Sequence, residues 1–179
     1  GSMADLNAGS LGDVKQRFRD YYGAANTVVV LAGDITPAVA KEKMLKYFGD
    51  IAAGPRVPRP QPWVAPREQS TRGTMTDNVA QTRIYREWNV PPRGSTDENL
   101  LELAAAVLGG GKTSRLYQRL VYRDKLADDV SVGVEQHSLA SLFELQVDVK
   151  QGVDPARVEA AIADEWRNFL AHGPSADEL

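Results

Sequence analysis

Cysteine is absent from the 179-residue chain, and histidine is scarce, with only two copies. The lack of cysteine excludes disulfide frameworks, thiolate zinc sites and thiol nucleophiles. His137 falls in an expected turn and His172 beside an expected helix end, and neither has a histidine partner at the spacing of a zinc-binding helix. The sequence therefore predicts no metal ligand and no catalytic residue in this chain.

Long apolar runs and a basic excess are missing as well. The longest apolar run, Leu103 to Leu108, is far shorter than the ~20 residues that cross a bilayer. The net charge is −3, whereas nucleic-acid binders normally carry a basic face, so no nucleic-acid partner is expected. No Gly-x-Ser-x-Gly elbow presents a serine nucleophile.

The composition that remains is that of an ordinary globular protein, with 42% hydrophobic and 25% charged residues. A chain of 179 residues suits one domain, so we expect a single domain over 1–179. Gly1-Ser2-Met3 carries no signal-peptide features, and Asp177-Glu178-Leu179 follows a turn signal just as a new helix would begin. We therefore expect this domain to be a fragment of a larger chain.

Capping residues, glycine stops and apolar periodicity predict five helices. They cover 11–22, 36–48, 95–108, 113–122 and 154–172. Runs rich in β-branched or alternating residues predict five strands, of which the first reads as buried because Val28 to Leu31 is continuous. The strands cover 26–34, 68–76, 80–90, 129–136 and 142–149. Five prolines predict a semi-rigid connector over 54–66.

Strands paired through short turns, with helices between the pairs, are typical of an α+β fold. We therefore expect a mostly antiparallel sheet with helices packed on one face. No internal repeat of fixed period is present.

The string Gly109-Gly110-Gly111-Lys112-Thr113-Ser114 ends like a phosphate-binding loop. That loop needs a glycine where this chain has Ala106, and it normally follows a strand rather than a helix. We interpret the string as a glycine-rich break between two helices, with Thr113 or Ser114 capping the second. A phosphate-binding function would need nucleotide affinity that is lost in Lys112→Ala.

Three arginines, Arg115, Arg119 and Arg123, recur every four residues along one expected helix face. We expect the stripe to be a solvated helix face; the alternative is a contact with an acidic partner surface or a substrate backbone.

Several strings resemble the second domain of pitrilysin/insulinase-type zinc peptidases, in the right order over nearly the whole chain. They are Asp5-Leu6-Asn7-Ala8, Phe18-Arg19-Asp20-Tyr21-Tyr22-Gly23, Asn26 to Asp34, Leu108 to Tyr117, Leu126-Ala127 and Val130-Ser131. The resemblance implies a metallohydrolase-like α+β domain without the zinc site, since the H-x-x-E-H motif of the family lies in the preceding domain.

The resemblance also implies partners and a compartment. Zinc is expected in the preceding domain of the parent chain, and none in this segment. The expected partners are that catalytic domain, a second half of the enzyme or a partner subunit that closes the chamber around the substrate, and a peptide substrate. The resemblance to this family suggests the bacterial periplasm or the membrane periphery as the compartment of the parent protein.

This chain departs from the family pattern at two positions. In these peptidases, the half of the enzyme that stabilises the transition state opposite the zinc carries an arginine and, seven residues later, a tyrosine. This chain has Val121 and Asp128 at those two positions. Valine cannot donate to an oxyanion, and aspartate would oppose it. The resemblance therefore implies the second domain of the zinc-bearing half.

The expected role is a supporting, non-catalytic domain of a zinc endopeptidase that helps to enclose peptides. Residues expected at the substrate chamber or an interdomain contact are Gly109, Gly110, Gly111, Ser114 and Arg115. The alternative is a scaffold or partner subunit of the same fold whose parent binds no zinc. A parent chain with H-x-x-E-H upstream would distinguish the two.

Overall fold

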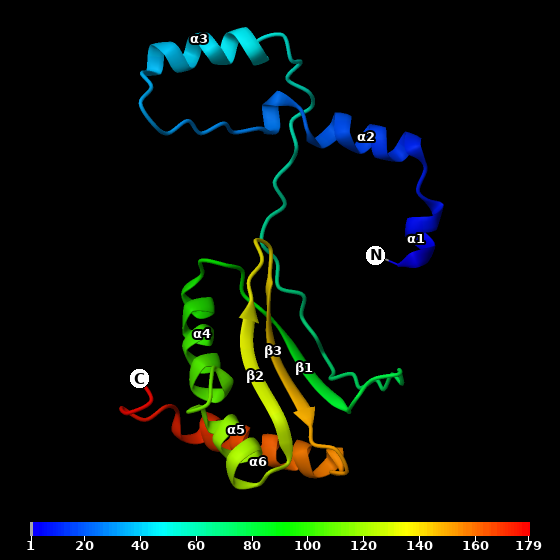
Figure 1. Cartoon of the computed structure of the whole chain (residues 1–179), viewed down its shortest axis with the longest axis vertical. Helices are drawn as coiled ribbons and strands as arrows, with labels where there is room; N and C mark the ends of the chain where they lie inside the picture. Colours follow the sequence, from blue (N-terminus) through cyan, green and yellow to red (C-terminus); the bar gives the residue numbers. More distant parts are fainter. Residues whose placement is uncertain (1) are drawn as a thin grey trace. The chain divides into compact units, whose positions relative to one another are not determined.

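The computed structural model describes residues 2–179 and divides into two compact units, one ending at Arg59 and the other beginning at Pro60 (Figure 1). This boundary lies inside the predicted connector 54–66. That the whole chain acts as one domain stays a prediction, and the two units are described separately below.

The first unit is helical. It comprises α1 (Met3–Ala8), α2 (Leu11–Tyr21), the short 3-10 helix η1 (Ala24–Asn26) and α3 (Pro37–Phe48). The predicted start of α2 is confirmed, because the Ser10 hydroxyl accepts from the Asp13 amide while the Asp13 carboxylate accepts from the Ser10 amide. Thr36 likewise caps α3, with proline at its first turn.

The strand predicted at 26–34 is wrong in this structure. Residues 27–32 belong to no helix or strand and pair with no strand among residues 2–179, and Val28 and Val30 are 88% and 83% exposed. The β-branched composition favours extended backbone, but a strand also needs a neighbour that supplies donors and acceptors.

The second unit holds the sheet and the core. Three strands, β1 (Arg83–Val90), β2 (Ala127–Glu135) and β3 (Ser141–Val149), pair antiparallel in the order β1-β3-β2. The helices are α4 (Thr96–Gly109), α5 (Arg115–Tyr117), the π-helix η2 (Gln118–Arg123) and α6 (Pro155–His172). The predicted α+β fold, an antiparallel sheet with helices on one face, is confirmed.

Alternation along the central strand decides which face is buried. Every second residue of β3, from Ser141 to Val149, is buried against the helices, while the residues between them lie on the other face. Helix α6 contributes Val158 and Ile162 to the same core. Trp166 of α6 also stacks on Trp88 of β1, with ring centroids 4.9 Å apart.

Two predicted elements differ in the second unit. The run 68–76 forms no strand, although its neighbour 80–90 does so from Arg83 onwards. The helix predicted at 113–122 is one helical turn followed by the π-helix, where the Asp124 amide donates to the Arg119 carbonyl at 2.8 Å. This wider turn leaves both Leu116 and Leu120 fully buried.

Leu108→Ala should lower the free energy of unfolding by about 2–5 kcal/mol, because Leu108 is 1% exposed and its truncation leaves a cavity. Urea unfolding followed by tryptophan fluorescence measures the change. Leu100→Ala, on the same helix but 61% exposed, is the matched control and should change stability by no more than about 0.5 kcal/mol. Equal effects of the two substitutions would contradict the assignment of the core.

Candidate functional site

The glycine break after α4 is held in place by close packing at its first residue. Gly109 is buried, and a Cβ placed there would collide with the side chain of Val132 and lie 2.8 Å from its amide nitrogen. Gly110 caps α4 by donating its amide to the Ala106 carbonyl at 3.1 Å. Gly111 is different, because a Cβ there would meet nothing within 4 Å. At Gly109, therefore, only a residue without a side chain lets α4 approach β2 this closely.

Ser114 closes the loop from the other side. It is 5% exposed, and both its amide and its hydroxyl donate to the Gly111 carbonyl, at 3.0 and 2.6 Å. It occupies the N-cap position of α5, as predicted, but its side chain makes no capping bond there. The amides of Gly110 and Ser114 are thus used inside the loop, unlike those of a loop that wraps phosphates.

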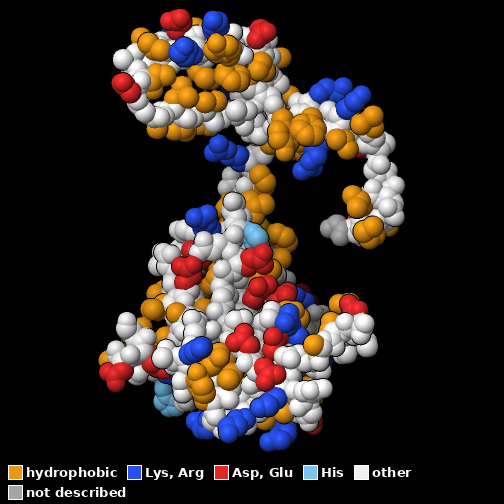
Figure 2. All heavy atoms as spheres, viewed as in Figure 1, with side chains coloured by type: hydrophobic (Ala, Val, Ile, Leu, Met, Phe, Trp, Pro, Cys, Tyr) orange, Lys and Arg blue, Asp and Glu red, His pale blue; other side chains and the backbone are white. Residues whose placement is uncertain are grey.

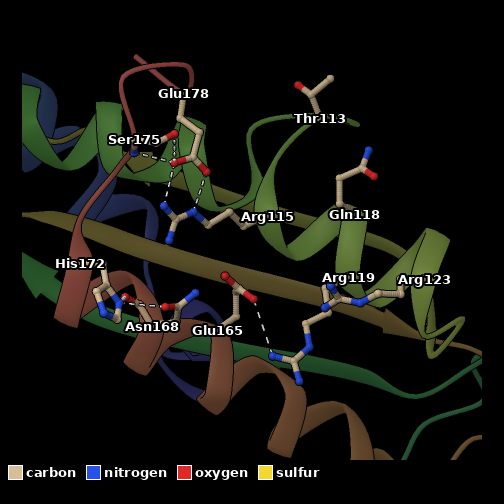
Figure 3. Close-up of a pocket in the computed structure, with 10 residues that line it drawn as sticks. All are labelled: Thr113, Arg115, Gln118, Arg119, Arg123, Glu165, Asn168, His172, Ser175 and Glu178. Atoms are coloured by element: carbon tan, nitrogen blue, oxygen red, sulfur yellow. Dashed lines mark hydrogen bonds and ion pairs between the residues drawn. The ribbon is translucent and has the colours of Figure 1, made fainter.

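Arg115 leads from the loop into an ion pair with the C-terminal turn (Figure 3). Its guanidinium donates to both carboxylate oxygens of Glu178, at 2.6 and 2.7 Å, and to the Gly173 carbonyl at 2.8 Å. It also lies over the ring of Phe169, 5.3 Å from the centroid. We call Arg115, Ser175 and Glu178 the C-terminal clasp.

Glu178 is held from two sides in this clasp. Besides the bonds from Arg115, it accepts from the amide and the hydroxyl of Ser175, at 2.7 and 2.9 Å. Arg115 first, and then the Ser175 amide, lower the pKa of Glu178 to about 2. The sequence did not single out Glu178, although Ser175-x-x-Glu178 has the spacing of a capping box.

Arg119, the second arginine of the stripe, faces α6, whereas Arg123 does not pair with it. Arg119 lies 3.3 Å from Asp164 and 3.6 Å from Glu165, and its side chain is 21% exposed. Arg123 is mostly exposed and pairs with Asp124. The expectation of a solvated stripe is therefore wrong for Arg115 and Arg119, which pair with acidic groups of their own chain.

Together these side chains line an open hollow of about 530 Å³ between α5, η2, α6 and the C-terminal turn (Figure 3). Its lining is polar and carries both signs of charge. The lining residues are Thr113, Arg115, Gln118, Arg119, Arg123, Glu165, Asn168, His172, Ser175 and Glu178. Among the five predicted contact residues, only Arg115 reaches this hollow.

The histidines do not build a metal centre with their neighbours. The Nδ1 atom of His172 contacts the backbone and side-chain oxygens of Asn168, and His137 lies 3.5 Å from Glu135. Among residues 2–179, no three His, Cys, Asp or Glu side chains gather closely enough to hold a metal ion. The described residues therefore do not fit zinc.

The two positions that depart from the family pattern have structural roles. Val121 packs partly against the core from η2. Asp128 lies at the register shift between Ala127 and Asp129 in β2, where the strand carries one extra residue relative to β3. This bulge keeps Ala127 and Val130 buried while Asp128 and Asp129 both remain exposed.

The fold and site together define an α+β domain that carries a packed glycine loop and no metal ligand set in its described part. A family model described as the peptidase M16 inactive domain matches residues 10–179. The chain belongs to this family of zinc proteases, as its inactive domain.

Known proteins agree with this assignment. The chain is 28% identical over 132 residues to the zinc protease PqqE of Helicobacter pylori, covering 71% of this chain and 29% of that protein. The crystal structure of a protease from Helicobacter pylori matches with a TM-score of 0.83 at 22% identity, covering 99% of this chain and 44% of that one. The M16 inactive domain from Pseudomonas fluorescens matches with a TM-score of 0.77 at 20% identity, covering 96% and 41%. The chain thus spans less than half the length of these relatives.

None of the helices over residues 2–179 combines the length and apolar character that crossing a bilayer requires.

Gly109→Ala should destabilise the chain by about 1–3 kcal/mol, because the added methyl group collides with Val132 and forces α4 away from β2. Gly111→Ala is the matched control, since a Cβ there meets open space, and it should leave stability nearly unchanged. Thermal unfolding of both variants by circular dichroism makes the comparison. A stable Gly109→Ala variant would show that α4 does not depend on this contact.

Arg115→Ala should raise the pKa of Glu178 from about 2 toward its ordinary value of 4.5, because the main donor to the carboxylate is lost. In the wild-type chain the clasp stabilises the fold above pH 4.5, and this contribution disappears as the pH falls toward 2. Carboxyl carbon NMR shifts during an acid titration report the pKa. Arg72→Ala, which removes the partner of Glu159 instead, should leave the pKa of Glu178 unchanged. No rise in Arg115→Ala would leave Ser175 as the dominant partner.

Proposed function

We propose that this chain is a supporting, non-catalytic domain of a zinc-dependent endopeptidase and helps to enclose peptide substrates for hydrolysis. The observation that carries the proposal is the match of residues 10–179 to the inactive domain of the M16 family. In this proposal the zinc and its water-activating glutamate lie in the preceding domain of the parent chain. The partners are that catalytic domain and a second half or partner subunit.

The contacts of Val121 and Asp128 support this role. A transition-state arginine needs a free guanidinium aimed at the reacting carbonyl. Val121 instead packs against the core, and Asp128 places a negative charge on the bulge of β2. The groups that stabilise the oxyanion are therefore expected from another half or subunit.

The glycine loop is the proposed point of contact with the rest of the protease. Gly110 and Gly111 are exposed, and Gly111 has open space where a side chain would be. Gly109, Ser114 and Arg115 are engaged within the chain, so their part is to position the loop. A surface with little side chain lets another backbone approach closely.

Gly111→Trp in the full-length parent should lower kcat/KM for peptide cleavage several-fold while leaving bound zinc unchanged, because the bulky ring fills the space at the contact. Gly73→Trp, also at a site where a Cβ would meet nothing within 4 Å, is the matched control and should retain activity. Zinc is measured by elemental analysis and cleavage with a quenched fluorescent peptide, beside the isolated 179-residue chain.

The outcomes separate the candidate functions. If the full-length parent binds zinc and cleaves the peptide while the isolated 179-residue chain does neither, the result favours a non-catalytic domain of a zinc endopeptidase. A parent without zinc would favour a scaffold or partner subunit of the same fold. Equal activity of the Gly111→Trp and Gly73→Trp parents would contradict the contact at the glycine loop.

A further inference from the structure

The outer face of the sheet, which points away from the helices, carries three glutamates side by side. Glu144 lies on the central strand β3, and Glu87 of β1 is directly opposite it. On the other side Gly133 of β2 is opposite, and Glu135 lies two residues further along on the same face. We call Glu87, Glu144 and Glu135 the carboxylate row. Figure 2 shows acidic side chains beside a histidine over the strands of this unit.

The carboxylate row lacks the basic partner that the sheet provides elsewhere on this face. Towards the other end, Arg83 of β1 lies opposite Asp148 of β3 and donates to both carboxylate oxygens, at 2.5 and 3.1 Å. Among residues 2–179, no lysine or arginine pairs in this way with the carboxylate row. The segment 61–66, which contacts Asn89 on this face, holds no charged residue. Like charges that face each other across strands destabilise a sheet.

Glu144 bears most of this repulsion, because it is half-buried and has a carboxylate on each side, whereas Glu87 and Glu135 are exposed. Burial first, then the charges of Glu135 and Glu87, raise the pKa of Glu144 above its ordinary value of 4.5. Glu144 also lies close enough to Glu135 to share a hydrogen bond with it. Gly133 leaves open space beside them, and the neighbouring Tyr85 on β1 is uncharged at neutral and acid pH.

His137, in the turn between β2 and β3, is the described group that opposes this shift. Its Nε2 atom lies 3.5 Å from a carboxylate oxygen of Glu135. The turn holds it there, since the Arg93 amide donates to the His137 carbonyl at 3.0 Å and the His137 amide donates to the Ser141 hydroxyl at 3.2 Å. The charge of His137 lowers the pKa of Glu144, and it does so only while the imidazole is protonated.

We propose that the carboxylate row is a proton-binding site, at which Glu144 takes up a proton from solvent and donates it in a hydrogen bond to Glu135 in acid. This proton removes the repulsion that Glu144 exerts on both neighbouring strands, and it adds a hydrogen bond between β2 and β3. Both effects act at the central strand, so the second unit becomes more stable as the carboxylate row is protonated. This inference does not rest on the proposed protease role.

The sign follows from the direction of the shift. The folded chain binds this proton more tightly than the unfolded chain, so the stabilisation is complete below pH 4.5 and is lost as the pH rises through the raised pKa of Glu144. The C-terminal clasp acts in the opposite sense and in another range, because its contribution disappears only as the pH falls from 4.5 toward 2. The two effects can therefore be measured separately.

Carboxyl carbon NMR during a pH titration of the unmodified 179-residue chain is the first test and needs no variant. Glu144 is expected to titrate above 4.5. Glu135→Gln should lower this pKa more than Glu87→Gln, and His137→Asn should raise it. A pKa of Glu144 at or below 4.5 in the unmodified chain, or one that Glu135→Gln leaves unchanged, would overturn the proposal.

Glu144→Gln tests the effect on stability, because it removes the charge at every pH. At pH 7 it should raise the folding equilibrium constant by roughly two- to fivefold, the effect of relieving one or two like-charge contacts between strands. The gain should shrink as the pH falls to 4.5, where Glu144 of the unmodified chain holds its proton. Urea unfolding at each pH is followed by fluorescence, since all three tryptophans lie in the second unit.

Glu68→Gln is the matched control, because Glu68 is exposed and lies outside the sheet. It should leave both the stability and its pH dependence as in the unmodified chain. Equal stability of the Glu144→Gln and Glu68→Gln chains at pH 7 would count against the proposal, as would a gain in Glu144→Gln that persists undiminished at pH 4.5.

Discussion

The pairing of β3 on both of its sides is the constraint on which the second unit depends. β1 and β2 do not bond to each other, and each joins the sheet only through β3. The buried row from Phe143 to Val149 is also the floor on which the helices pack. Because the side-chain period of a strand is two, a shift of one residue in β3 would turn this whole row outward.

The glycine loop and the C-terminal clasp are positioned by elements that pack on this buried face of β3. Gly109 lies against Val132, and Val132 is placed by its pairing with Leu145 of β3. Arg115 follows the loop and meets Gly173 and Glu178, which come after α6. The loop is thus fixed by backbone packing and the clasp by charge-assisted hydrogen bonds, so the two respond differently to pH.

Local signals predicted α2, α3 and α6 well, because caps and stops act within a few residues of the sequence. Ser10, Thr36 and Asp154 each cap the helix that follows, and the bounds of α2, α3 and α6 agree closely with the prediction. The strand at 26–34 failed because β-branched composition says nothing about whether a pairing partner is present. Arg115 could be singled out from its stripe, but its partner lies 63 residues away, and no local spacing reveals such a pair.

The two units differ in how much of their apolar surface is buried. The second unit buries a continuous core, whereas the first buries nothing among its described residues, although both belong to one family match over 10–179. The described core therefore lies in the second unit, and the apolar surface buried there is what stabilises that unit.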